Sequence, residues 1–191
     1  MAGTRAGALA RAAAHIDGGA FFEELRRRVA IPTESQEPDR APDLDRYLRA
    51  EIAPSLAPLG FRSEIFPNPE PGGGPFLVAE RHESDALPTL ITYGHGDVVR
   101  GIPEQWRDGL DPWTLTQEGD RWYGRGSADN KGQHSIVMAA LAQVLAERGS
   151  LGFNAKLLIE TSEEIGSPGL DAFVAGEAER LKADVFIASD G

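Results

Sequence analysis

The chain has 191 residues, of which 41% are hydrophobic and 26% charged, so it can bury one ordinary core and predicts a single domain. Its net charge of −11 argues against a nucleic-acid partner, and the absence of cysteine excludes a disulfide scaffold or thiolate metal site. No apolar run is long enough to span a bilayer, and the lack of cysteine favours a reducing compartment, so we expect a cytoplasmic protein with no membrane partner.

Residues 1–18 are predicted to form an N-terminal extension, followed by one folded unit over residues 19–191. The first 15 residues are rich in alanine and lack the apolar block of a secretory signal. We expect a frayed first helix or a start-site extension there, and a cleaved organelle-targeting segment is the alternative.

The first half of the folded unit predicts two helices and three strands. A helix over residues 19–30 carries its apolar residues on one face. A second helix is expected to begin at Asp43 as N-cap and to end at Gly60. Alternating or continuous apolar residues predict strands over 61–66, 76–80 and 89–93, the last of them central in the sheet.

The second half predicts two short strands, then alternating helices and strands. The short strands cover 113–117 and 121–123, and the remaining elements are a helix from Ser135 to near Gly149, a strand over 155–160, a helix from Pro168 to about Leu181 and a strand over 184–188. This alternation predicts an α/β fold with a mostly parallel, mixed sheet and helices on both faces.

A glycine-rich loop over residues 123–133 precedes the long helix. It contains three glycines and one carboxylate, Asp129. Glycine is used where the backbone turns tightly or approaches another group closely. The loop is therefore predicted to deliver Asp129 to a defined place at the start of a helix.

Three predicted buried strands are each followed at once by acidic or histidine side chains. Because the carboxyl ends of parallel strands share one edge of a sheet, these residues and Asp129 are expected to gather there. The set is His95, Asp97, Asp129, Glu163, Glu164 and Asp190. So many carboxylates repel one another unless cations compensate them, and imidazole with carboxylates suits zinc, with manganese or cobalt as alternatives.

The spacing within two of these motifs suggests separate roles. In a strand, residues i and i+2 point the same way, so Asp97 can lie beside His95 and accept its second ring N–H. Glu163 and Glu164 are adjacent and diverge, so one can bind metal while the other carries a proton. Taken singly, each motif also fits a surface pair or a solvated helix start. The loop could also cradle phosphate, but Asp129 would repel it.

Four motifs in register resemble the dinuclear-zinc metallopeptidases and amidohydrolases. This family includes carnosinase-like dipeptidases, glutamate carboxypeptidase, acetylornithine deacetylase, succinyl-diaminopimelate desuccinylase and aminoacylase. The matching stretches begin at Tyr93-Gly-His-Gly-Asp, Gly119-Asp-Arg-Trp-Tyr-Gly-Arg-Gly-Ser-Ala-Asp-Asn-Lys-Gly, Thr161-Ser-Glu-Glu-Ile-Gly and Ser189-Asp-Gly. Trp106 and Asp111-Pro-Trp113 fit the same pattern.

The resemblance implies a role for each candidate residue. His95, Asp129 and Asp190 would hold one metal, and Asp129 would bridge to a second metal bound by Glu164. Asp97 would orient His95, and Glu163 would be the general base and acid in hydrolysis of an amide bond by a water between the metals. The family also implies a cis peptide at Asp129–Asn130. Asn130, Lys131 and Arg125 are expected to shape the loop, and His134 to lie on the surface or line the helix.

The resemblance covers only the first part of a catalytic domain. Family members continue through a lid and dimerisation domain and return with a histidine for the second metal, so we expect a truncated form with weak second-metal binding and little activity alone. The full-length form is expected to be a homodimer acting on a small peptide or N-acyl amino acid. Substrate identity and native metal stay open. A non-catalytic metal-binding or assembly module is the alternative function, and a nucleotide-binding domain is disfavoured by the acidic site.

Overall fold

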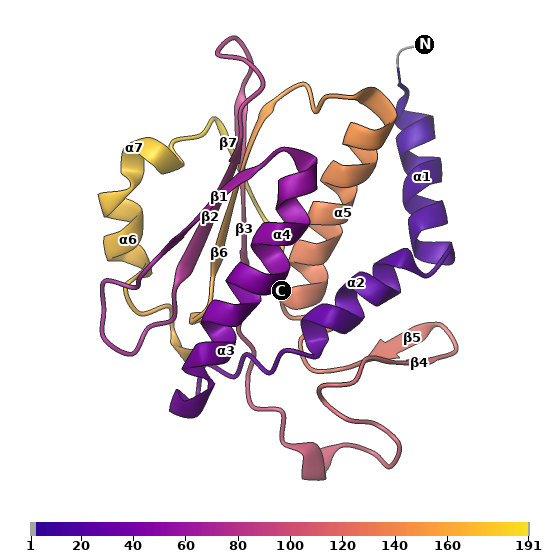
Figure 1. The fold of residues 1–191 in the computed structure, drawn as a ribbon, viewed down its shortest axis with the longest axis vertical. Helices are drawn as coiled ribbons and strands as arrows, with labels where there is room; N and C mark the ends of the chain where they lie inside the picture. The colour runs from indigo at the N-terminus through magenta and orange to yellow at the C-terminus, as the bar shows by residue number, and fades with distance from the viewer. Residues whose placement is uncertain (1–2, 191) are drawn as a thin grey trace.

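A computed structural model describes residues 3–190 and has a five-stranded mixed sheet at its centre (Figure 1). The strand order is β1-β2-β6-β3-β7. The bounds are β1 Arg62–Phe66, β2 Phe76–Arg81, β3 Thr89–His95, β6 Asn154–Glu160 and β7 Val185–Ala188. β3 pairs in parallel with β6 and β7, whereas β2 is antiparallel to both β1 and β6. β2 alone therefore runs against the other strands of the sheet, which confirms the predicted mixed α/β fold.

Helices cover both faces of this sheet, as predicted (Figure 1). α3 (Ala41–Arg46), α4 (Ala53–Leu56) and α5 (Lys131–Arg148) cover one face, and α6 (Leu170–Gly176) and α7 (Ala178–Leu181) cover the other. Successive side chains of β2 point to opposite faces of the sheet and so contribute to both helical layers. Leu77 packs in the core with Met138 of α5, while Phe76 packs with Phe173 of α6.

The predicted N-terminal extension contains a regular helix rather than a frayed one. α1 (Arg5–Asp17) begins at Thr4, whose hydroxyl accepts the N–H of Gly7 at 2.9 Å. It lies along α5, where Arg11 pairs with Glu147 at 2.8 Å (Figure 1). The first two residues lie outside the described part. The division of the chain at residue 18 stays a prediction.

α2 (Ala20–Val29) fits the predicted amphipathic helix and packs beside a small hairpin. Leu25 and Val29 form a cluster with Leu115, which precedes the hairpin strands β4 (Thr116–Glu118) and β5 (Arg121–Tyr123). β4 is shorter than the predicted strand over 113–117. The Asp111 carboxylate accepts the Trp113 N–H at 2.8 Å and bends the backbone into a turn there.

The helix predicted to begin at Asp43 starts earlier and is irregular, so the N-cap prediction was wrong. A 3-10 turn over Pro38–Arg40 precedes α3, and a π-helical segment over Tyr47–Ile52 joins α3 to α4. The N–H of Ala53 donates to the carbonyl of Leu48, five residues back, and Pro54 has no N–H to donate. A further 3-10 turn over Ala57–Leu59 ends at Gly60, as predicted.

The helix predicted from Pro168 to Leu181 begins at Leu170 and is divided at Glu177, after Gly176, which is a poor helix former. Across residues 3–190, no helix combines the length and apolar character that a membrane crossing requires.

Candidate metal centre

All candidate residues but Asp129 lie at or just after the carboxyl ends of the parallel strands β3, β6 and β7, and Asp129 comes from the loop before α5. His95 is the last residue of β3 and pairs in register with Glu160, the last residue of β6. β7 ends at Ala188, two residues before Asp190. The strand ends therefore bring together segments nearly 100 residues apart in the sequence, at the predicted edge.

His95 is the centre of the cluster, and its ring is fully buried. Its Nε2 atom lies 3.0 Å from Asp129 Oδ1, 3.7 Å from Glu163 Oε2 and 3.8 Å from Asp190 Oδ1. Those three carboxylates are 64%, 37% and 32% exposed, respectively. One nitrogen of a buried imidazole thus faces a group of carboxylates that solvent and ligands can reach.

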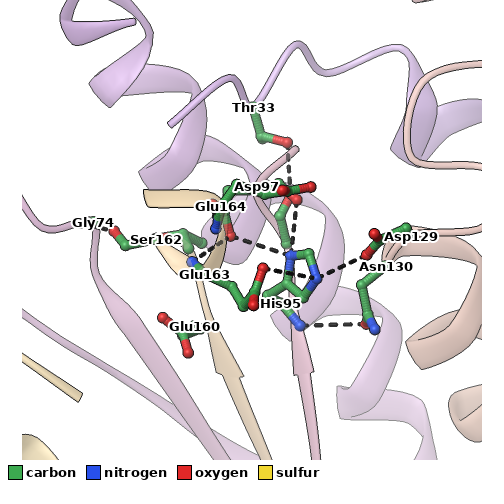
Figure 2. Close-up of polar contacts among 12 residues, drawn as sticks. Thr33, Gly74, His95, Asp97, Asp129, Asn130, Glu160, Ser162, Glu163 and Glu164 are labelled. Atoms are coloured by element: carbon green, nitrogen blue, oxygen red, sulfur yellow. Dashed lines mark hydrogen bonds and ion pairs between the residues drawn. The ribbon is translucent and has the colours of Figure 1, made fainter. Parts of the chain in front are cut away.

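Asp97 lies on the other side of the ring. His95 Nδ1 is 3.1 Å from the Asp97 carbonyl oxygen and 3.4 Å from its carboxylate. The carboxylate also accepts the backbone N–H groups of Glu163 and Glu164, at 3.2 and 3.1 Å (Figure 2). Asp97 therefore ties the His95 ring to the segment that carries both glutamates. Sequence spacing predicted the first of these contacts and not the second.

The two glutamates begin a 3-10 turn, Glu163–Ile165, and a carboxylate oxygen of each lies within 4.8 Å of a His95 ring nitrogen. Glu163 faces His95, whereas Glu164 Oε1 accepts the N–H of Val99 at 3.3 Å. Upstream, the Ser162 hydroxyl accepts the N–H of Gly74 at 2.5 Å and fixes the start of the turn.

The glycine-rich loop presents Asp129 from the opposite side of His95. The Asp129–Asn130 peptide is cis, as the family resemblance implied. Gly126 has φ of 78°, and a Cβ on Gly132 would lie 2.0 Å from the carbonyl oxygen of Ser127, so both positions require glycine. Lys131 is buried and donates to the carbonyls of Arg28 and Ile31 at 3.0 and 2.6 Å.

Asn130 connects the loop to two strands. Its Oδ1 accepts the backbone N–H of His95 at 3.3 Å, and its Nδ2 donates to the Ser189 carbonyl at 2.7 Å. These contacts, with the Lys131 anchor, confirm the loop-shaping roles predicted for the two residues. Arg125 also belongs to the loop's frame, since its N–H donates to the Pro112 carbonyl at 2.7 Å and its guanidinium lies over Trp106.

Sequence reasoning missed two buried polar groups beside the cluster. His134, expected on the surface or lining the helix, is only 2% exposed and lies between Tyr47 and Asn130. Its position four residues after Asn130 on a helix is the signal that could have found it. Glu160 is also buried, and its Oε1 accepts the hydroxyls of Tyr93 at 2.6 Å and Ser167 at 2.9 Å.

The cluster has an excess of negative charge that shifts its pKa values. Burial opposes protonation of His95, but Asp97, Glu163 and Asp129 outweigh it and raise the pKa of His95 to about 9. Burial and the Asp129 charge raise the pKa of the Glu164 carboxyl, and burial raises that of Glu160. The excess of carboxylates thus favours added positive charge at this site, and its donors suit a divalent cation.

The geometry fits a metal. Nitrogen or oxygen atoms of His95, Asp129 and Asp190 lie within 4.8 Å of one another, and so do those of His95, Glu163 and Glu164. The first group is the ligand set predicted for one metal. Asp129 and Glu164, predicted to share the second metal, fall in different groups. With His95 Nδ1 held by Asp97, Nε2 is directed toward the first group, as in proteins that bind metal through histidine.

Comparisons with known proteins identify the family. The pattern of the family described as "Peptidase family M20/M25/M40" matches residues 91–190, just over half of the chain, so the chain belongs to this family. A Beta-Ala-His dipeptidase of Rattus norvegicus is 33% identical over 188 residues, covering 89% of this chain and 37% of the relative. An acetylornithine deacetylase of Proteus mirabilis is 31% identical over 160 residues, covering 84% and 40%.

The fold is also similar to solved structures. The crystal structure of human carnosine dipeptidase 1 matches with a TM-score of 0.87 and 30% identity, covering 97% of this chain and 41% of that one. The chain therefore spans about two fifths of the length of these three proteins.

Proposed function

We propose that this chain carries a zinc-dependent site for hydrolysis of the amide bond of a small peptide or an N-acyl amino acid. The observation that carries the proposal is the convergence of His95 Nε2, at the carboxyl end of β3, with the partly exposed Asp129 and Asp190 carboxylates, 3.0 and 3.8 Å away. Membership of a peptidase family supports the same chemistry.

In this proposal, His95, Asp129 and Asp190 hold one metal, and Asp129 and Glu164 contribute to a second. Zinc suits these donors best, with manganese or cobalt as alternatives. When bound, the metals would polarise the scissile carbonyl and lower the pKa of the attacking water. Asp97 holds the His95 ring in the orientation that directs Nε2 to the metal.

Glu163 is the proposed general base and acid. Its carboxylate is 37% exposed and its Oε2 lies 3.7 Å from His95 Nε2, so it can reach both solvent and the ligand cluster. It would take a proton from the attacking water as the oxygen–carbon bond forms. It would then give this proton to the leaving amine nitrogen as the carbon–nitrogen bond breaks.

The relatives suggest the substrate class. One is named a Beta-Ala-His dipeptidase and another an acetylornithine deacetylase, so dipeptides are the first candidates and N-acyl amino acids the second. A cytoplasmic location and a homodimeric full-length form also belong to this proposal.

A hydrolysis assay with a matched variant tests the proposal. The purified protein, loaded with Zn²⁺, Mn²⁺ or Co²⁺, is assayed against a panel of dipeptides and N-acetyl amino acids. We expect a low, metal-dependent rate that chelation abolishes and that Glu163→Gln lowers by about 10²–10⁴-fold while metal affinity is retained. Indistinguishable rates for metal-loaded wild type and Glu163→Gln would refute the assigned role.

The second candidate is a non-catalytic metal-binding or assembly module. The observation that favours it is that only one donor group matches a predicted ligand set, whereas Asp129 and Glu164 lie in separate groups. Tight metal binding without detectable turnover on the whole panel would select this alternative.

A further inference from the structure

His134 lies behind the candidate metal centre, in a chain of three buried side chains. Its Nε2 is 2.6 Å from the Tyr47 hydroxyl, and its Nδ1 is 3.2 Å from Asn130 Oδ1. Gly94 of β3 closes over this contact, since a Cβ there would lie 2.9 Å from Asn130 Oδ1 and 3.0 Å from the His134 Cβ. The histidine therefore joins the π-helical segment to the loop that carries Asp129.

Two backbone groups fix the donor and the acceptor in each hydrogen bond that links Tyr47, His134 and Asn130. The His95 N–H can only donate, and it faces Asn130 Oδ1 at 3.3 Å. The Ser189 carbonyl can only accept, and it lies 2.7 Å from Asn130 Nδ2. The Asn130 amide therefore has one orientation, with its oxygen toward His134. Because that oxygen accepts, His134 Nδ1 must carry the hydrogen, and Nε2 accepts from the Tyr47 hydroxyl.

The protonation states agree with this direction. Burial, together with the charge of Arg28, holds the pKa of His134 well below its usual range, so its ring is neutral. Burial also raises the pKa of Tyr47, so its hydroxyl keeps its proton and can donate.

We propose that His134 is a positioning residue of the metal centre. As the neutral Nδ1–H form, it donates to Asn130 Oδ1 and adds to the two backbone contacts that hold this amide between the His95 N–H and the Ser189 carbonyl. Asn130 Nδ2 is 2.7 Å from both the Ser189 carbonyl and Gln133 Oε1, and 3.3 Å from Asp190 Oδ1, so a rotated amide would present its oxygen to three acceptors and displace Asp190 from His95. The inference rests on the proposed function, in which Asp190 and His95 are ligands.

Three substitutions separate positioning from packing. His134→Asn keeps an N–H near the place of Nδ1, His134→Gln moves the amide toward the place of Nε2, and His134→Leu keeps bulk without hydrogen bonds. We expect zinc affinity, measured by competition with a chromophoric chelator, to stay close to wild type in His134→Asn. It should fall about 10–100-fold in the other two variants. If side-chain volume alone mattered, the smaller asparagine would be the weakest binder.

Thermal unfolding in excess chelator checks that each variant folds. If His134→Leu does not fold, His134→Gln alone provides the comparison with His134→Asn. Equal zinc affinity in all variants, or weakest binding by His134→Asn, would overturn this inference while leaving the proposed function intact. Zinc binding that does not change in Asp129→Asn would overturn the proposed function, and this inference with it.

A second measurement needs no metal. Nitrogen-15 chemical shifts and two-bond couplings of the imidazole rings distinguish the neutral forms of histidine. For metal-free wild type we expect His134 to carry its hydrogen on Nδ1, whereas a hydrogen on Nε2 would contradict the directed chain.

Discussion

The two nitrogens of His95 meet different partners, and this asymmetry defines the site. Nε2 faces Asp129 and Asp190, whereas Nδ1 faces Asp97. An imidazole held at one nitrogen presents the other nitrogen in a fixed direction. This fixed orientation favours metal binding, because the ring does not have to stop rotating when the metal binds.

Asp97→Asn tests this residue-scale account. The Asp97 carboxylate accepts from Glu163 N–H and Glu164 N–H with different oxygens, and an amide would leave one of these groups facing an NH₂. We expect zinc affinity to fall about 10–100-fold, measured by chelator competition. Asp171→Asn, at an exposed position of α6, is the control and should bind as wild type does. An Asp97→Asn protein with unchanged affinity would show that the ring needs no such support.

At the scale of elements, the first turn of α5 packs closely against the backbone of the loop before it. Gly132→Ala should lower the free energy of unfolding by about 1–3 kcal/mol, because the new Cβ would lie 2.0 Å from a backbone oxygen of Ser127. Elsewhere in a helix the same change usually stabilises. Gly176→Ala in α6 is the control, since a Cβ there has no neighbour within 4 Å. Equal effects of the two changes on chemical denaturation would argue against the close approach.

Glu83 connects the turn before β3 to the turn before β6. It accepts the N–H groups of Leu151 and Gly152 at 2.7 and 2.9 Å. Burial opposes ionisation, but these bonds and Arg81 outweigh it, so the pKa of the Glu83 carboxyl is lowered in the folded state. Its contribution to stability is therefore present above 4.5, the unperturbed value, and is lost as pH falls through the lowered pKa.

Glu83→Gln should accordingly reduce the free energy of unfolding by about 1 kcal/mol at neutral pH. The difference from wild type should shrink in acid, as chemical denaturation at both pH values would measure. Glu118→Gln, which breaks an exposed ion pair with Arg107, should change little at either pH. A Glu83→Gln deficit that is independent of pH would contradict the assignment.

The elements were predictable where local pattern decides them. Runs of apolar residues marked the strands, and the strand ends therefore marked His95 and Asp190. The π-helical segment was not predictable, because it depends on where Leu48 finds its hydrogen-bond partner. The pairing of β2 with β6 was not predictable either, because it joins strands about 80 residues apart in the sequence.

For the whole molecule, the acidic cluster and the Asp97 contact to His95 were predicted, whereas the contacts of His134 and Glu160 were not. The ligand candidates follow buried strands directly, so topology alone brings them together. The contacts behind them, such as Tyr47 with His134, join separate helices whose packing no local pattern specifies. The substitutions at His134 and Asp97 test these supporting contacts directly.

The central claim is that His95, Asp129 and Asp190 form a zinc site. A zinc titration of wild type, Asp129→Asn and the control Asp171→Asn, followed by competition with a chromophoric chelator, tests it most directly. We predict one tight site in wild type and control, a weaker second one, and a loss of tight binding on the order of 100-fold or more in Asp129→Asn. Equal zinc affinity and stoichiometry in all three proteins would contradict the account.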